Sequence, residues 1–154
     1  MPGQTPTLII CYDGSDRAKH AIEVAAKLFP GAPAKILHVW EPIEHIVARY
    51  AALAPYLGES TDDADAGFER ESESVAQEGA ELAKAAGLDA SAHTAILENS
   101  VWQSVLEAGG RLDGELIVTG TRSLRGAHEL LVGTLSHALL QHGHIPLLAV
   151  PAAE

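Results

Sequence analysis

The stretch TLIICYDGSDRAKHAIEVAAKLF, residues 7–29, decides the fold. Its first part, Thr7–Tyr12, is a short, continuous apolar run rich in β-branched and aromatic residues, which predicts a strand buried on both faces. Asp13, Gly14 and Ser15 end this strand. Ser15 or Asp13 can then cap a helix that reaches Phe29, because apolar residues recur there every three or four positions. A buried strand followed by an amphipathic helix is typical of a parallel α/β sheet.

The same alternation continues along the chain. Further strands are predicted at Ala34–Trp40, Asp89–Leu97, Glu115–Thr119 and Leu147–Val150. Helices are predicted at Phe68–Ala86, from Ser100 to the pair Gly109-Gly110, and at Gly133–Gln141. The order β-α-β-α-β-α-β-α-β predicts an α/β fold in three layers, with a doubly wound, five-stranded parallel sheet, in a single domain over residues 1–154. Ile43–Gly67 is too long for an ordinary connection, so we expect a lid, a local helix or a mobile segment.

The composition argues against several classes of function. The net charge is −11, from 21 acidic and 10 basic residues, so we expect no basic face for nucleic-acid phosphates. The one cysteine, Cys11, cannot form an internal disulfide, which suits a reducing compartment. We find neither a signal peptide at the N-terminus nor the roughly 20 apolar residues of a membrane span. We therefore expect a cytoplasmic protein with no nucleic-acid or membrane partner.

The segment from Gly120 to Thr134 is the best candidate for a phosphate-binding loop. Ligands of doubly wound sheets bind beyond the carboxyl ends of the strands, where the strand order reverses, which directs attention to the loops after the first and fourth strands. Gly120 allows a sharp turn close to a ligand, and Gly133-Thr134 opens a helix whose free N–H groups attract anions. Arg122 and Arg125 add positive charge. The alternative is an ordinary helix cap beside a solvated arginine loop.

The familiar nucleotide motifs are missing, but another spacing is present. The chain has no GxxxxGK[ST] string and no GxGxxG after the first strand. It resembles the universal stress proteins that bind ATP, whose pattern is Gly, two residues, Gly, nine residues, then Gly with Ser or Thr. Gly120 and Gly133-Thr134 match this pattern, whereas Ser123 replaces the second glycine. The stretches LHV at 37–39 and PLLAVP at 146–151 extend the resemblance over nearly the whole chain.

The resemblance implies a Rossmann-like fold of the adenine nucleotide alpha hydrolase-like type, with ATP as the ligand. It implies that Asp13 faces the adenine, that the Val39 backbone contacts the nucleotide and that Gly120 lies beside the ribose. The residues that it places around the phosphates are Arg122, Ser123, Gly133, Thr134 and Leu135. Asp13 has the alternative role of a helix cap, and Val39 that of a core residue. Ser123 weakens the site if the glycine it replaces needs a positive φ, and does little if its hydroxyl donates to a phosphate.

Other chemistry has little support in the sequence. His137, His142 and His144 lack the spacing of a zinc site, and His38 fits a hydrogen-bonded core position. The chain has no nucleophile elbow of the GxSxG type. Nothing in the sequence positions a water for attack on ATP, so any ATP hydrolysis should be slow. Asp13 could hold Mg²⁺ together with the phosphates.

The last strand, Leu147–Val150, is expected at a sheet edge, where it could pair with a second copy to form a homodimer. Flanking prolines that block the edge are the alternative. The leading hypothesis is therefore a cytoplasmic, dimeric, ATP-binding stress protein that acts as a ligand-gated regulator. The alternatives are a relative that does not bind nucleotides and acts through dimerisation and partner contacts, and a slow ATP hydrolase.

Overall fold

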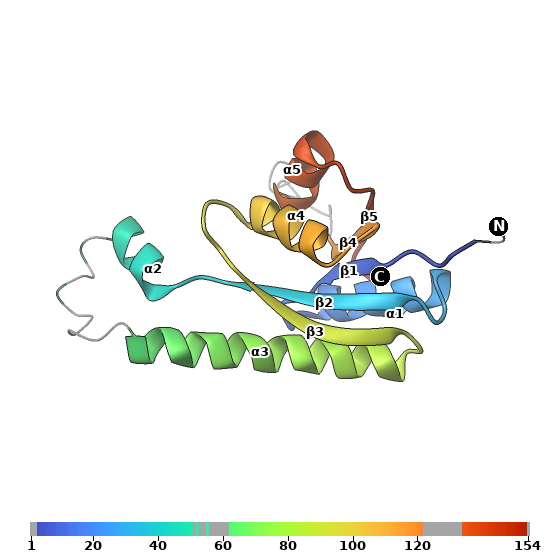
Figure 1. The fold of residues 1–154 in the computed structure, drawn as a ribbon, viewed down its shortest axis with the longest axis horizontal. Coiled ribbons are helices and arrows are strands. Elements are labelled where there is room, and N and C mark those ends of the chain that lie inside the picture. The colour runs from blue at the N-terminus through green and yellow to red at the C-terminus, as the bar shows by residue number, and fades with distance from the viewer. Residues whose placement is uncertain (1–2, 51, 53–54, 56–61, 122–133, 154) are drawn as a thin grey trace.

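The computed structural model describes residues 3–50, 52, 55, 62–121 and 134–153, and it alternates strands with helices (Figure 1). The strands are β1 (Leu8–Cys11), β2 (Pro33–Trp40), β3 (Asp89–Ile96), β4 (Leu116–Gly120) and β5 (Leu147–Val150). The helices are α1 (Asp16–Leu28), α2 (Ile43–Arg49), α3 (Asp62–Ala85), α4 (Val101–Arg111) and α5 (Thr134–His142).

The five strands form one parallel sheet in the order β3-β2-β1-β4-β5. The chain therefore winds from β1 through β2 to β3 in one direction, and returns to the other side of β1 for β4 and β5. This confirms the doubly wound sheet expected from the sequence. The carboxyl ends of β1 and β4 lie next to each other at the point where the strand order reverses.

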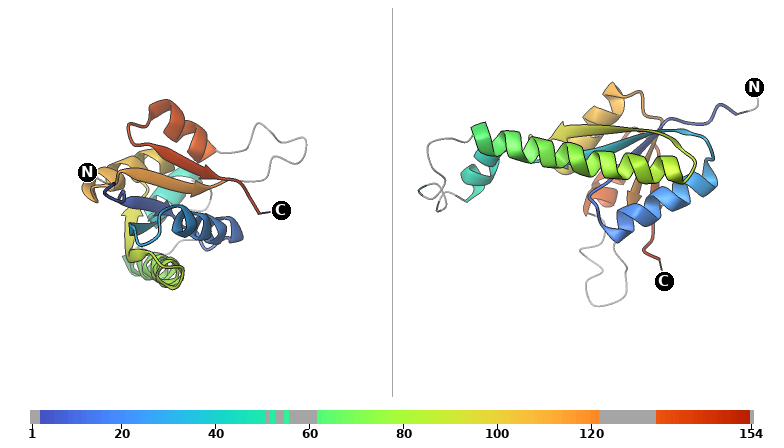
Figure 2. Two further views of the ribbon diagram at one scale, coloured as in Figure 1. Left: turned by 90° about the vertical axis from the view of Figure 1, so that its right-hand side faces the viewer. Right: turned by 90° about the horizontal axis from the view of Figure 1, so that it is seen from below.

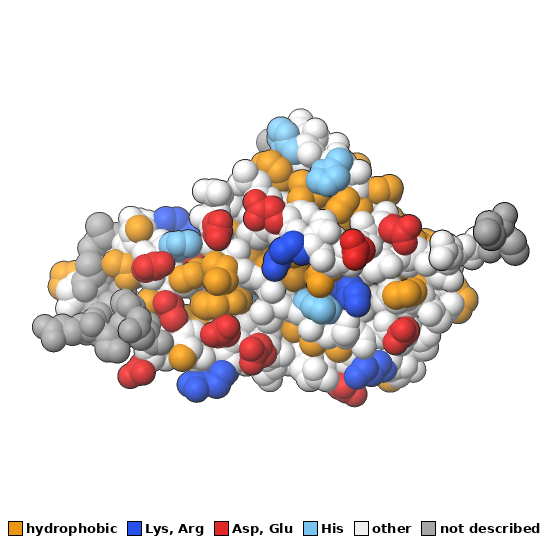
Figure 3. Space-filling view, viewed as in Figure 1, with side chains coloured by type: hydrophobic (Ala, Val, Ile, Leu, Met, Phe, Trp, Pro, Cys, Tyr) orange, Lys and Arg blue, Asp and Glu red, His pale blue; other side chains and the backbone are white. Residues whose placement is uncertain are grey.

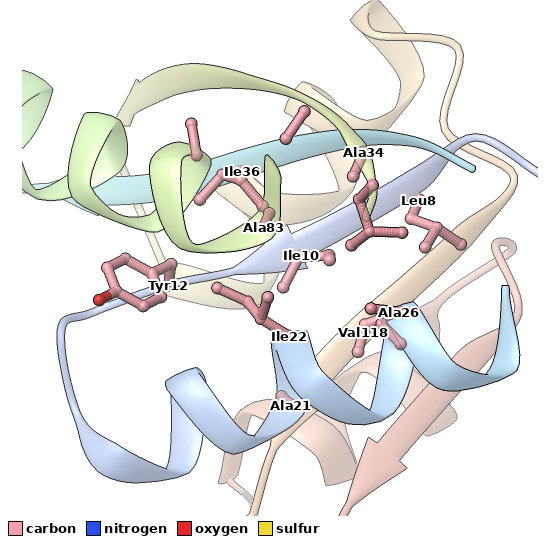
Figure 4. Packing of buried hydrophobic residues seen from close by; sticks show 14 of the residues in the cluster. Leu8, Ile10, Tyr12, Ala21, Ile22, Ala26, Ala34, Ile36, Ala83 and Val118 are labelled. Atoms are coloured by element: carbon pink, nitrogen blue, oxygen red, sulfur yellow. The ribbon is translucent and has the colours of Figure 1, made fainter. Parts of the chain in front are cut away.

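Helices cover both faces of the sheet and make a three-layer molecule (Figure 2). Helices α1 and α3 pack together on one face, and α4 and α5 on the other. Side chains of β1 alternate between the two cores: Leu8 and Ile10 lie in the core toward α1 and α3, and Ile9 lies in the other core. Figure 4 shows the first core, where Ile22 of α1 and Ala83 of α3 approach the strands. Burial on both faces explains why β1 is a continuous apolar run.

The turn from β1 into α1 resolves the choice between two capping residues. The Ser15 hydroxyl accepts a hydrogen bond from the Ala18 amide at 3.3 Å, so Ser15 is the N-cap. The Asp13 carboxylate instead accepts from the Ser15 amide at 3.0 Å. Gly14 has a φ of +80°, a left-handed conformation that favours glycine.

Two helix predictions need correction. Helix α3 begins at Asp62 and not at Phe68, so it includes the last part of the segment Ile43–Gly67. Helix α4 passes through Gly109-Gly110 and ends at Arg111. A Cβ atom on Gly109 would lie 3.0 Å from Cδ1 of Ile145. Gly109 is therefore a close packing position inside a helix, and not a helix terminator.

Helix α2 lies at the start of Ile43–Gly67, where a local helix was one of the three expected possibilities. It has no buried residue and is held by two longer-range hydrogen bonds. The Ile43 amide donates to Asp65 of α3 at 2.7 Å, and Nδ1 of His45 lies 2.8 Å from the Leu97 carbonyl oxygen.

On the face drawn in Figure 3, basic side chains are scattered among acidic ones and form no continuous basic patch. No helix in the described part of the chain is long and apolar enough to cross a lipid bilayer.

Candidate functional site

A crevice of about 180 Å³ opens at the carboxyl edge of the sheet, where β1 and β4 meet. Every layer of the fold contributes to it. The lining residues are Cys11, Tyr12, Asp13, Ser15, Arg17, Ala18, Leu37, His38, Val39, Val101, Val105, Thr119, Gly120 and Leu135. Its position is the one that doubly wound sheets use for ligands.

Two opposite charges lie at this crevice, on the turn after β1 and on the first turn of α1. The Asp13 carboxylate is partly desolvated, which raises its pKa, but hydrogen bonds from the Ser15 hydroxyl and amide, together with the nearby Arg17 guanidinium, lower it by more. The net effect is a pKa below the ordinary value, so Asp13 is ionised at neutral pH. Arg17 is half-buried and lines the same crevice.

Gly120 brings β4 and α1 into close contact. A Cβ atom on this residue would lie 2.6 Å from the Arg17 carbonyl oxygen, which is too close for a side chain, and 3.1 Å from the Arg17 Cβ, which is a tight contact. Glycine is therefore required here for packing against α1. The φ of Gly120 is not positive, so the sharp turn expected from its sequence position is not what demands glycine.

The start of α5 is attached to the end of β4 by a buried hydrogen bond. The hydroxyls of Thr119 and Ser136 lie 3.0 Å apart, and both residues are buried. This contact holds the first turn of α5 beside the crevice, and Leu135 from that turn lines it. The N-terminal amides of a helix attract anions.

The ends of β1 and β2, together with α4, form the remaining walls. Nδ1 of His38 lies 2.8 Å from the Tyr12 carbonyl oxygen, which confirms the expected hydrogen bond, although His38 is only half-buried. Val101 and Val105 of α4 contribute apolar surface. Burial raises the pKa of the Cys11 thiol to about 12, so this thiol stays protonated at neutral pH and is a poor nucleophile.

The structure brings part of the predicted site together. Asp13, Val39, Gly120 and Leu135 all line the crevice. Thr134 is the first residue of α5, and Arg122, Ser123 and Gly133 lie outside the described residues. No residue of α2 lines the crevice, so the described part of Ile43–Gly67 gives no cover to it.

The sequence reading missed Arg17 and Val101. Both lie in the first turn of a helix that follows a strand, and the N-termini of such helices face the carboxyl edge of a parallel sheet. That signal could have found them.

Metal-binding chemistry has a limited basis in the described residues. No group of three or more His, Cys, Asp or Glu side chains is placed to hold an ion among them. Asp13 is the one carboxylate among the lining residues of the crevice. A hard cation such as Mg²⁺ usually takes one or two protein carboxylates, with water and substrate phosphates as its other ligands.

Comparisons with known proteins agree with this architecture. A model of the Universal stress protein family matches residues 5–151. A universal stress protein of Thermus aquaticus is 28% identical over 146 residues, covering 94% of this chain and 97% of its own. One from Methanocaldococcus jannaschii is 27% identical over 152 residues, covering 93% of this chain and 80% of its own.

Solved structures share the fold at lower identity. A universal stress family protein from Burkholderia pseudomallei has a TM-score of 0.69 at 22% identity, covering 98% of this chain and 100% of its own. A universal stress protein in complex with cAMP has a TM-score of 0.66 at 16% identity, covering 96% and 98%. One from Archaeoglobus fulgidus in complex with dAMP has a TM-score of 0.60 at 17% identity, covering 94% and 97%. Because the family match spans nearly the whole sequence, this chain belongs to the universal stress protein family.

Proposed function

We propose that this protein binds an adenine nucleotide, with ATP as the expected ligand, in the crevice between the ends of β1 and β4. The nucleotide would control a dimeric cytoplasmic regulator. The observation that carries the proposal is the position of the crevice at the reversal of strand order, lined by Asp13, Val39, Gly120 and Leu135. The complexes of two structural neighbours with cAMP and dAMP support the same ligand class.

The walls of the crevice suit a base and a sugar. Small-molecule pockets usually measure roughly 300–1,000 Å³, and this crevice measures about 180 Å³. Its size therefore suits the base and the sugar, with the first phosphate at its rim and any further phosphates outside it, toward the N-terminus of α5. The valine side chains offer apolar surface to a base, and the ionised Asp13 can accept hydrogen bonds from an amino or hydroxyl group.

The binding of Mg²⁺ would depend mainly on ligands that the nucleotide supplies. Because Asp13 is the one carboxylate lining the crevice, the phosphates and water would supply the other ligands. The chemistry that Mg²⁺ contributes is neutralisation of phosphate charge in an acidic protein.

Blocking the crevice tests the proposal. Val101 lines the crevice and is 42% exposed, so Val101→Trp should fill the opening without disturbing the core. Leu140→Trp is the matched control, because Leu140 is 70% exposed on α5 and does not line the crevice. Calorimetric titration with Mg-ATP should show micromolar to near-millimolar binding to the wild type and to Leu140→Trp. We expect a loss of at least about tenfold in Val101→Trp.

Two outcomes would change the assignment. If the purified wild type carries no nucleotide by mass spectrometry and shows no heat of binding at millimolar ATP, the protein does not bind nucleotides, and a role through dimerisation and partner contacts replaces the proposal. If it binds and releases phosphate steadily from ATP, the protein is a slow hydrolase.

A further inference from the structure

Arg17 is a charged residue of the crevice to which the family's sequence pattern, as matched above, gives no role. Among the described residues that line the crevice, it is the one Lys or Arg side chain. The whole chain has only 10 such residues against 21 acidic ones. A cation retained in the crevice of a protein with a net charge of −11 has a strong electrostatic effect on any anion that enters.

We propose that Arg17 binds the phosphate group nearest to the sugar, and that the crevice therefore recognises adenosine monophosphates, linear or cyclic, through this contact. The inference rests on the proposed function and adds the chemical class that the site prefers over an uncharged nucleoside. Arginine suits this contact because its planar guanidinium donates two parallel hydrogen bonds to a phosphate.

The packing of Arg17 fixes its place over the end of β4. The position of a Cβ atom on Gly120 is 2.6 Å from the Arg17 carbonyl oxygen and 3.1 Å from the Arg17 Cβ, so this arginine leaves the backbone directly above Gly120. Its charge also reaches Asp13, whose pKa it helps to lower. Arg17 therefore lines the crevice beside the ends of β1 and β4.

The negative charge of Asp13 is a second reason to expect a phosphate contact by Arg17. An ionised carboxylate at the crevice repels an anionic ligand, and the repulsion is strongest for the phosphate closest to it. Arg17 compensates this charge at short range, so it allows a phosphate to lie near Asp13. An uncharged nucleoside needs no such compensation, and its affinity should not depend on Arg17.

The test compares ligands that differ only in charge. Adenosine, AMP and cAMP are titrated calorimetrically into the wild type, Arg17→Gln and Arg17→Lys at low ionic strength. Arg17→Gln should weaken binding of AMP and cAMP by roughly tenfold to a hundredfold, the range for a lost hydrogen bond to a charged group. Adenosine should bind to all three proteins with the same affinity within about twofold. Arg17→Lys, which keeps the charge without the planar group, should fall between the wild type and Arg17→Gln for AMP.

Arg111→Gln is the matched control. It removes the same charge from the end of α4, at a residue outside the crevice. AMP should bind to this variant as it does to the wild type. Equal losses in Arg111→Gln and Arg17→Gln would show a general charge effect and overturn the inference.

Two failures can be told apart. If the wild type binds neither adenosine nor any nucleotide, the proposed function itself is wrong. If it binds AMP but Arg17→Gln weakens adenosine and AMP equally, or neither, then the site exists and Arg17 is not its phosphate contact.

Discussion

At the scale of single residues, Tyr12 links β1 with the helices of one face. Its ring lies in the core toward α1 and α3 (Figure 4), and its hydroxyl donates a hydrogen bond to Glu78 Oε1 of α3 at 2.6 Å. Lys19 Nζ of α1 lies 3.5 Å from the same oxygen. Burial, followed by the bond to Glu78 and the charges of Glu78 and Asp13, raises the pKa of Tyr12 far above its ordinary value of 10.0.

This pKa shift predicts how stability changes in alkali. In the unfolded chain Tyr12 ionises near its ordinary pKa, whereas in the folded protein it keeps its proton to higher pH. The folded state therefore binds more protons above pH 10, and its stability falls as the pH rises through this range. Tyr12→Phe should cost about 1 kcal/mol at pH 8, where the hydrogen bond is intact. The difference in stability between the wild type and Tyr12→Phe should shrink above pH 10.

Urea unfolding at pH 8, 9.5 and 10.5 measures this difference. Tyr50→Phe, at an exposed ring, controls for the loss of a tyrosine in general. A stability difference between wild type and Tyr12→Phe that stays constant over this range would contradict the assignment of the shift to the folded state.

The residues of the crevice were only partly predictable from sequence. The resemblance to the family singled out Asp13 and Val39, and both lie at or just after the end of a strand, where the carboxyl ends of parallel strands share one edge. Arg17 was missed although its place in the first turn of the helix after β1 could have indicated it, whereas the close approach of α1 to Gly120 is a tertiary contact that the sequence does not show. The same contact shows that position 120 needs glycine for close packing against α1, and not for a sharp turn.

At the scale of elements, two glycines inside helices play different roles. Gly79 lies inside the C-terminal part of α3, where a Cβ atom would be 2.7 Å from both Ile36 Cγ2 and Tyr12 Cδ1. Gly110 of α4 has no atom within 4 Å of the same position and is exposed. Gly79 therefore allows α3 to approach the sheet, whereas Gly110 contributes no packing.

Alanine substitutions at these positions should have opposite effects. Gly79→Ala should destabilise the protein by about 1–3 kcal/mol, because overpacking of the core outweighs the gain in helix propensity. Gly110→Ala should stabilise it by up to about 1 kcal/mol through helix propensity alone. Thermal and urea unfolding of both variants measure the effects. A stabilising Gly79→Ala would mean that α3 can move away from the sheet at little cost.

The bounds of the strands could be predicted to within about one residue, and the bounds of the helices less well. Buried parallel strands are short apolar runs with clear ends, so Leu147–Val150 was predicted with its observed bounds. Helix α2 has no buried face to give it a pattern, and its hydrogen bonds join residues 22 and 52 positions apart. Local sequence carries no sign of contacts at such separations.

At the scale of the whole molecule, β5 ends the sheet, and no strand in the described part of the chain pairs with its outer edge. The Ile117 amide donates to the Pro146 carbonyl and the Thr121 amide to the Val150 carbonyl, so the backbone groups of these even-numbered positions face β4. Because backbone groups alternate along a strand, those of Leu147 and Ala149 point away from the sheet. Two copies related by a two-fold axis could pair through these groups.

Proline at Ala149 tests the dimer that we propose through this edge. Ala149 is exposed, and Ala149→Pro removes an outward N–H while leaving the ladder to β4 intact. The wild type should have twice the chain mass of 16.2 kDa in light scattering, and Ala149→Pro should shift toward the monomer with an unchanged fold. Ala149→Thr keeps the N–H and should remain dimeric. A dimeric Ala149→Pro would place the interface elsewhere, and a monomeric wild type would exclude a dimer-based regulator.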